Sequence, residues 1–272
     1  MSADDADDER PVFLGILPRV ELFPRLRSFF EHIGQVTLLF TRAVRVLTST
    51  RFEWHEYVYQ IEQLGVRSLA IACATATFVG MVMTLQFAYF AEKYGAQEAL
   101  GRIIGLSEAR ELAPALTSLV VGCRIAAGMA AEPGSMAVTE QIDAIRALGA
   151  DPIRKLVVPR ILAGMTALPM LCAIALVLGM FSSMMVAWAS FGVATETFRS
   201  AALDALRMGD LASGIAKTPV FGLLITLVGC HFGMTTHGGT EGVGRSTTSS
   251  VVVAAITILV SDALLTQLFL SL

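Results

Sequence analysis

The chain has 272 residues, of which 54% are hydrophobic and 16% charged, with a formal net charge of −3. Ordinary soluble domains contain about 25% charged residues, and a nearly balanced charge gives no reason to expect a nucleic-acid partner. The apolar residues fall in uncharged runs long enough to cross a bilayer, not in patterns that alternate with polar residues. The composition therefore indicates an all-α integral membrane protein.

The first ten residues are strongly acidic, because they include Asp4, Asp5, Asp7, Asp8 and Glu9. A secretory signal needs a basic start that is followed directly by an apolar stretch, so this segment is not predicted to be one. We expect residues 1–22 to form a solvated, acidic cytoplasmic tail.

Residues 23–64 are predicted to form an interfacial helical region. Apolar side chains such as Phe23, Phe30 and Phe40 recur mostly at spacings of three, four and seven, while Arg42 and Arg45 share the remaining positions with other charged residues. This pattern is typical of an amphipathic helix that is too charged to span the membrane. Basic residues beside an aromatic stripe favour a helix in the headgroup plane. The alternative is a soluble helix packed on another domain, for which the chain offers no candidate.

Five spans are predicted, at about residues 68–91, 112–131, 161–191, 218–238 and 247–270. The first is uncharged and reaches about 36 Å as a helix, enough for a hydrocarbon core of ~30 Å. The uncharged run of residues 161–195 is too long for one bilayer and too short for two spans with a loop. We therefore expect a long or tilted helix that bends near Pro169 or ends near Gly192.

The distribution of basic residues predicts which side of the membrane each end faces. With five spans, thirteen Lys and Arg residues fall on the side of the N-terminus. Five fall on the opposite side: Lys93, Arg102, Arg110, Arg199 and Arg207. The positive-inside rule then places the N-terminus in the cytoplasm.

Charges within the spans are candidate functional residues, because each costs roughly 2.5–3.5 kcal/mol at a helix centre on insertion scales. By depth, Arg110, Glu111, Lys217 and Asp262 share the outward third of the membrane. We expect them to line a polar cavity, with Lys217 and Asp262 as a pair. The alternative for Lys217 and Arg110 is that they snorkel to the outer headgroups.

The inner half of the second span contains Arg124 and ends at Glu132. Small residues recur there every four positions, a spacing that lets helices approach closely within the bundle or against a second copy. They are Ser118, Gly122, Ala126 and Ala130. A contact between Arg124 and the substrate is an alternative to a packing role.

A short cytoplasmic helix is predicted at about residues 139–148, because Pro133 and Gly134 break the preceding helix and Gly149 and Pro152 stop this one. Its polar residues are Glu140, Gln141, Asp143 and Arg146. The helix is either a solvated connector or a coupling helix that docks on a motor subunit, and spacing alone leaves both interpretations open.

The sequence contains none of the common catalytic motifs: G-x-x-x-x-G-K-[ST] for nucleotide, G-x-S-x-G, or H-E-x-x-H. His231 and His237 are six residues apart, which does not place them on one helical face as metal ligands, and the four cysteines lack paired spacing. We therefore predict no catalytic residue, metal or cofactor in this chain. The alternatives are a proton-coupled secondary transporter of an amphipathic substrate, with Asp262 and Glu111 as carriers, and an intramembrane enzyme.

Several motifs resemble those of the MlaE/YrbE family of ABC transporter permeases. Ala109-Arg110-Glu111-Leu112-Ala113-Pro114 is similar to that family's R-E-L-[GA]-P motif. The central signature is matched by Ala131-Glu132 through Gly134, Met136, Thr139-Glu140-Gln141-Ile142, Asp151-Pro152-Ile153 and Val158-Pro159-Arg160, and the last motif by Gly242-Val243-Gly244-Arg245 with Thr247-Thr248. The chain departs from the family at Pro133, Cys123 and Ser249.

The resemblance implies a homodimeric permease in the inner (cytoplasmic) membrane that moves phospholipids or related lipids to or from the cell envelope. It also implies two cytoplasmic ATPase subunits, which bind the ATP, and a lipid-binding MCE-domain protein on the outer side. The family's coupling helix corresponds to about residues 139–148 here. Its charged cavity residues correspond to Arg110, Glu111, Lys217 and Asp262, and Arg245 belongs to its inner-face motif.

Overall fold

The computed structural model describes residues 22–49 and 53–271, and in these ranges the regular structure is entirely helical. The helices are α1 (Leu22–Ser49), α2 (Trp54–Leu64), α3 (Leu69–Lys93), α4 (Leu100–Ser107), α5 (Thr117–Val138), α6 (Gln141–Ala147), α7 (Val158–Phe191), α8 (Thr195–Ala205), α9 (Met208–Met234) and α10 (Gly239–Ser271). Short 3-10 turns, η2 (Val66–Ser68) and η3 (Gln97–Ala99), precede α3 and α4. Two π-helical segments, η4 (Glu108–Leu116) and η5 (Ile153–Val157), lead into α5 and α7. The predicted tail, residues 1–22, lies almost wholly outside the described residues.

Within residues 22–49 and 53–271, five helical stretches are long and apolar enough to cross a membrane. They are Trp54–Lys93, Gln97–Val138, Ile153–Phe191, Met208–Met234 and Gly239–Ser271. The predicted class, an all-α membrane protein with five spans, is therefore confirmed. Each stretch begins before the predicted run, with turns that carry charged or polar residues, while the fourth ends at Met234, four residues before the predicted end.

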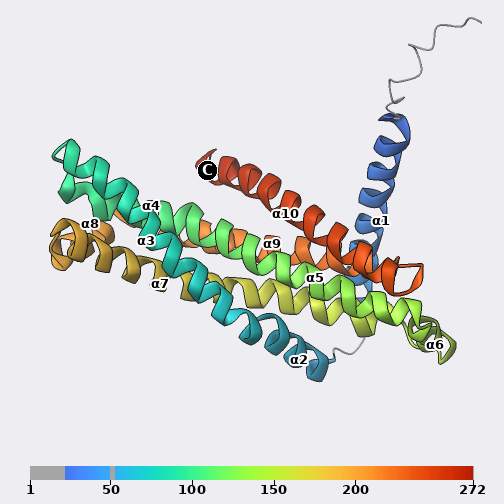
Figure 1. The fold of residues 1–272 in the computed structure, drawn as a ribbon. Helices are drawn as coiled ribbons and strands as arrows, with labels where there is room; N and C mark the ends of the chain where they lie inside the picture. The colour runs from blue at the N-terminus through green and yellow to red at the C-terminus, as the bar shows by residue number, and fades with distance from the viewer. Residues whose placement is uncertain (1–21, 50–52, 272) are drawn as a thin grey trace, which may run out of the picture.

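The long helices run side by side, with α3 against α7, α5 against α9 and α10, and α7 against α9 (Figure 1). Helices α4 and α8 pack on each other at one end of this bundle, and α6 lies at the other (Figure 1). Helix α1 stands at an angle to the bundle at the α6 end, where it contacts α9 and η5. Its predicted place in the headgroup plane stays a prediction.

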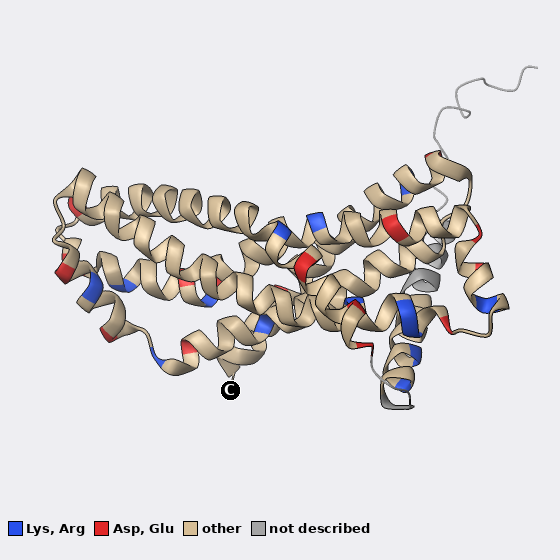
Figure 2. Ribbon diagram, turned by 90° about the horizontal axis from the view of Figure 1, so that it is seen from below, with Lys and Arg blue, Asp and Glu red and all other residues tan. Residues whose placement is uncertain are grey.

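The outer surface of the bundle is apolar over most of its length. Charged residues are sparse along the long helices (Figure 2). Large apolar side chains are exposed there, among them Phe78, Val82, Phe181, Val252 and Leu264. A surface of this kind suits contact with lipid chains or with another membrane subunit.

Helix α7 has 34 residues, so it is about 50 Å long. Pro169 lies inside the helix without ending it, and the helix stops at Gly192, whose φ of 66° is the left-handed conformation of a C-terminal cap. Of the two alternatives left open by the sequence, termination near Gly192 is the one observed.

The prediction that Pro133 and Gly134 break the second span is wrong, since α5 continues through both to Val138. Pro133 has no backbone N–H, so the carbonyl oxygen of Met129 lacks its usual donor four residues later in the helix. Gly233 of α9 lies against this turn, where an added Cβ would be 3.0 Å from that oxygen. The break falls instead at Glu140, which has a φ of 58°. Helix α6 (Gln141–Ala147) is consequently shorter than the predicted 139–148.

Close helix crossings depend on small residues. Gly122 of α5 faces Ile225 and Ile258, while the Ser250 hydroxyl of α10 donates a 3.2 Å hydrogen bond to the Ala126 carbonyl. The face predicted from small residues at four-residue spacing therefore packs within the bundle. Helices α7 and α9 cross where Gly164 and Gly222 bring their backbones together, with no space for a Cβ at Gly222 beside the Gly164 carbonyl.

We expect Gly222→Ala to destabilise the protein by about 1–3 kcal/mol, because the added methyl group overpacks this backbone crossing. Thermal unfolding of the purified protein in detergent measures the change. Gly128→Ala is the matched control: this helical glycine has nothing within 4 Å of an added Cβ. Equal stability of the two variants would contradict the proposed crossing constraint.

Candidate functional site

The candidate site is built on η4, the π-helical segment that joins α4 to α5. It contains Arg110, Glu111 and Pro114, and π-helical turns occur frequently at functional sites. The segment lies directly on α9, because Gly214 has no Cβ to collide with the carbonyl oxygen of Ala109. This close approach brings the side chains of η4 within reach of Lys217.

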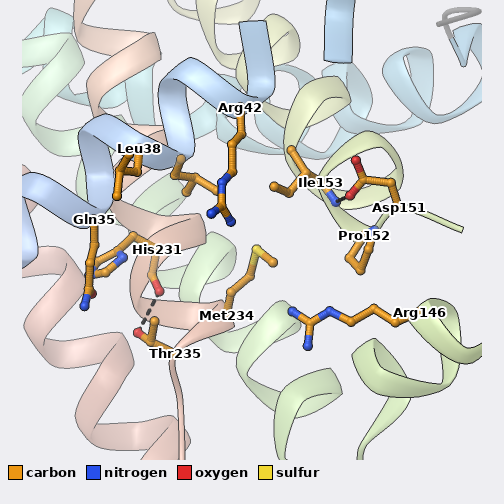
Figure 3. A pocket seen from close by; sticks show the side chains of 11 residues that line it. Gln35, Leu38, Arg42, Arg146, Asp151, Pro152, Ile153, His231, Met234 and Thr235 are labelled. Atoms are coloured by element: carbon orange, nitrogen blue, oxygen red, sulfur yellow. Dashed lines mark hydrogen bonds between the residues drawn. The ribbon is translucent and has the colours of Figure 1, made fainter. Parts of the chain in front are cut away.

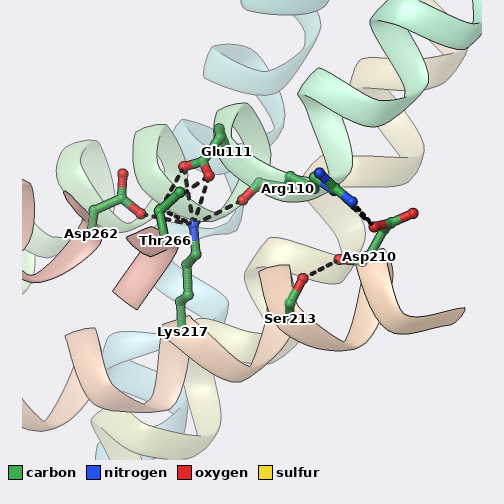
Figure 4. A network of polar contacts seen from close by, with 7 residues as sticks. All are labelled: Arg110, Glu111, Asp210, Ser213, Lys217, Asp262 and Thr266. Carbon is green, nitrogen blue, oxygen red and sulfur yellow. Dashed lines mark hydrogen bonds and ion pairs between the residues drawn. The ribbon is translucent and has the colours of Figure 1, made fainter. Parts of the chain in front are cut away.

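The ammonium group of Lys217 is the centre of a polar cluster (Figure 4). The side chain is only 2% exposed, and Nζ lies 3.0 Å from Glu111 Oε1 and 3.2 Å from Asp262 Oδ1. Nζ also donates to the Thr266 hydroxyl at 2.6 Å, and that hydroxyl donates to Glu111 Oε1 at 3.0 Å. One buried cation is thus shared by two carboxylates, which links η4, α9 and α10.

Arg110 does not join this cluster through its side chain. Its guanidinium forms an ion pair with Asp210, with Nε 2.8 Å from Oδ1, while its carbonyl oxygen accepts a 3.1 Å hydrogen bond from Lys217. The other oxygen of Asp210 accepts the backbone N–H of Arg207 at 3.0 Å, at the start of α9. Asp210 therefore both caps α9 and orients Arg110.

A cavity of about 760 Å³ lies beside both groups of charges. Arg110, Glu111 and Lys217 line it together with Leu106, Phe269 and Leu270. The side chain of Arg110 is 45% exposed and that of Glu111 39% exposed, so both remain accessible within this space. Three of the four predicted residues line this cavity, whereas Asp262 is not part of the lining and pairs with Lys217, as the sequence predicted.

The charges predicted near the other end of α5 make structural contacts. Arg124 Nη1 donates to the Ser68 hydroxyl at 2.6 Å, which ties α5 to the turn before α3. Glu132 forms a 2.9 Å ion pair with Arg160, whose side chain is 2% exposed. Both arginines thus cross-link helices, and neither lines the cavity of Arg110.

The residues predicted for coupling lie on or just before α6, at the opposite end of the bundle. Glu140, Gln141, Asp143 and Arg146 are exposed, and Arg146 pairs with Asp143 at 2.7 Å on the same helix. Arg245 is likewise exposed and pairs only with Glu241 at 3.4 Å among its described neighbours. This exposed polar face is accessible to a partner protein.

Sequence reasoning missed Asp210, Thr266 and Glu108, and it named Arg160 only within a family motif, without its ion pair to Glu132. Thr266 lies four residues after Asp262, so helical spacing places both on one face and could have predicted its participation. Asp210 three residues after Arg207 at a helix start was a second usable signal. Glu108, only 2% exposed and next to Gly179 of α7, has an Oε2 atom with no partner in the described structure, and no sequence pattern indicated its burial.

The site contains charged, hydroxyl and apolar groups around a cavity, and such groups bind and orient a ligand. Among residues 22–49 and 53–271, no group of three His, Cys, Asp or Glu side chains has the geometry of a metal site. His231 is buried near one end of α9, remote from the Lys217 cluster along that helix.

A helical bundle with five apolar spans and a charged cluster beside a cavity is the architecture of a multi-pass membrane protein with a polar site between its helices. The profile of the family described as permease MlaE matches residues 57–268. The chain belongs to this family and is an ABC transporter permease subunit.

Curated relatives extend the match over most of the chain. The chain is 39% identical to the protein TRIGALACTOSYLDIACYLGLYCEROL 1, chloroplastic, of Arabidopsis thaliana, over 87% of this chain and 65% of the plant protein. It is 38% identical to a probable ABC transporter permease protein of Synechocystis, over 90% of this chain and 91% of that protein. A probable ABC transporter permease protein of Rickettsia felis is 33% identical, over 90% of this chain and 95% of its own length.

We expect Lys217→Met to lower the free energy of unfolding by about 3 kcal/mol, because it leaves Glu111 and Asp262 close together without their shared cation. Thermal or denaturant unfolding in detergent measures the loss. Lys93→Met, at an exposed lysine, is the control. Adding Glu111→Gln and Asp262→Asn to Lys217→Met should restore part of the stability, and no recovery would contradict the shared-cation account.

Proposed function

We propose that this permease moves phospholipids or related lipids between the inner membrane and the cell envelope, driven by a separate ATPase. The observation that carries the proposal is the cavity at which Arg110, Glu111 and Lys217 meet Leu106, Phe269 and Leu270. A lipid presents the complementary combination, a charged or polar headgroup joined to apolar chains. The name of the plant relative contains that of a galactolipid, which supports a lipid as the cargo here.

The assembly that we propose is a homodimer. Helix α10 contacts the rest of the described chain mainly through α5 and α9 and exposes a row of large apolar side chains. They are Val252, Val253, Ile256, Leu259, Val260, Leu264 and Leu268. A second copy on this face would extend the cavity wall that Phe269 and Leu270 begin, and so would enclose acyl chains between two protomers.

The energy source that we propose is ATP bound by two cytoplasmic ABC subunits. The exposed helix α6 at one end of the bundle presents Gln141, Asp143 and Arg146. These polar and charged side chains are suited to docking of such a subunit by charge complementarity. The cavity lies at the other end of the bundle, where an MCE-domain protein would receive or deliver the lipid. Under this topology the N-terminus is cytoplasmic.

Lipid transfer in proteoliposomes tests the energy source. With the cognate ATPase co-reconstituted, transfer of a fluorescent phospholipid should require ATP hydrolysis, and its rate should not change when a proton gradient is imposed. Asp143→Lys should weaken ATPase association and abolish transfer, because it reverses a charge on α6, while Glu196→Lys on α8 should leave both unchanged. Transfer that follows the proton gradient without ATP would instead favour a secondary transporter.

Arg110→Gln should reduce lipid transfer about tenfold, the loss expected when one charge-assisted hydrogen bond to a headgroup is removed. The double variant Arg110→Gln/Asp210→Asn also removes the carboxylate charge that the first change leaves unpaired. If it transfers lipid as slowly as the single variant, the loss comes from the guanidinium and not from an unpaired Asp210. Arg102→Gln, on the exposed surface of α4, serves as the control.

A further inference from the structure

A second hollow lies at the opposite end of the bundle from the Lys217 cluster. Its volume is about 470 Å³, and α1, α6, α9 and the connection before η5 all contribute to its wall. Its residues His231 and Met234 on α9 lie at least fourteen positions beyond Lys217, roughly 21 Å of helix. The two sites are therefore separate.

Two guanidinium groups approach this hollow from different sides. Figure 3 shows Arg42 reaching in from α1 and Arg146 from α6, with Met234 between their ends and Gln35 and His231 at the far side. Arg42 has no hydrogen bond or ion pair with any described residue, whereas Arg146 is held by Asp143. The acidic residue in the wall, Asp151, uses its Oδ1 oxygen to accept the backbone N–H of Ile153 at 2.9 Å.

This arrangement is suited to an oxyanion. A guanidinium presents a planar fork of N–H donors that matches phosphate, and it binds more strongly when the ligand carries charge. Arg42 supplies such a fork without a competing carboxylate partner, and the Gln35 amide offers a further donor across the hollow, whereas the Thr235 hydroxyl already donates to the His231 carbonyl at 2.8 Å. Leu38, Met234 and Pro152 belong to the apolar part of the wall.

The position of the hollow favours a ligand that belongs to the membrane. Leu38 lines it and is nevertheless 58% exposed, and Phe40, Val44 and Leu47 of the same helix are also exposed. Beneath the other flank of α1 lies a smaller hollow of about 250 Å³ with an apolar lining that includes Val44, Leu162 and Leu223. Helix α1 therefore covers the bundle loosely, and an amphiphile could place its chains along α1 with its headgroup at Arg42.

We propose that the hollow between α1, α6 and α9 binds the phosphate group of an anionic lipid in the leaflet on the α6 side. The bound lipid holds α1 against α6 and α9 and is distinct from the transported cargo. The proposal concerns binding by the permease chain alone, so it holds or fails independently of lipid transport.

Native mass spectrometry of the delipidated full-length protein tests this site. Binding of phosphatidylglycerol should be tighter than that of phosphatidylcholine, and Arg42→Gln should weaken phosphatidylglycerol binding about tenfold, as expected for one charge-assisted hydrogen bond. Gln35→Glu should weaken it as well, because it adds a negative charge to the lining of the hollow. Arg67→Gln is the matched control, since Arg67 is an exposed arginine outside the hollow.

The outcomes separate the sources of the phosphate group. Competition by millimolar inorganic phosphate with phosphatidylglycerol at Arg42 would show that the hollow recognises the phosphate group itself, with the lipid chains adding affinity. Inorganic phosphate binding that depends on Arg42, without any preference for phosphatidylglycerol, would overturn the lipid assignment. Equal lipid binding by Arg42→Gln and Arg67→Gln would overturn the proposal. It would also be overturned if Arg42→Gln left lipid binding intact and weakened only association with the ATPase.

Discussion

The arrangement of the candidate site depends on one buried ammonium group. Lys217 lies on α9, yet its partners come from η4 and α10, so a single cation fixes the relative positions of three segments that are far apart in the chain. A lysine in this environment is costly unless it is paired, and its two carboxylates would repel each other without it. The three charges are therefore stable only together, and they keep the wall of the cavity in place.

Close backbone contacts make this pairing geometrically feasible. Gly214 lets η4 lie on α9 near Lys217, and the crossing at Gly164 and Gly222 holds α9 against α7. In a membrane there is little hydrophobic force between helices, so small residues and interhelical hydrogen bonds carry much of the association. The hydrogen bond of Ser250 to Ala126 and the ion pair of Arg160 with Glu132 serve the same purpose farther along the bundle.

The two hollows and the charges around them lie at opposite ends of the bundle. This separation agrees with our proposal that one end binds the lipid and the other docks the ATPase. At the α4 and α8 end, charges surround a cavity that could admit an amphiphile. At the α6 end, charges are exposed on a short helix and around a second hollow beneath α1. Helix α7, about 50 Å long, runs between these two ends (Figure 1).

The sequence by itself determined the all-α membrane class, the five spans and the positions of the embedded charges, because bilayer thickness and the cost of buried charge act on local composition. It also predicted the pairing of Lys217 with Asp262 from depth. Only the tertiary structure decided that Glu111 shares the same cation, that Arg110 turns to Asp210, and that Pro133 leaves α5 unbroken. These outcomes depend on which backbone lies opposite each residue, for example Gly214 beside Ala109 and Gly233 beside Met129, and helical periodicity carries no information about a neighbour on another helix.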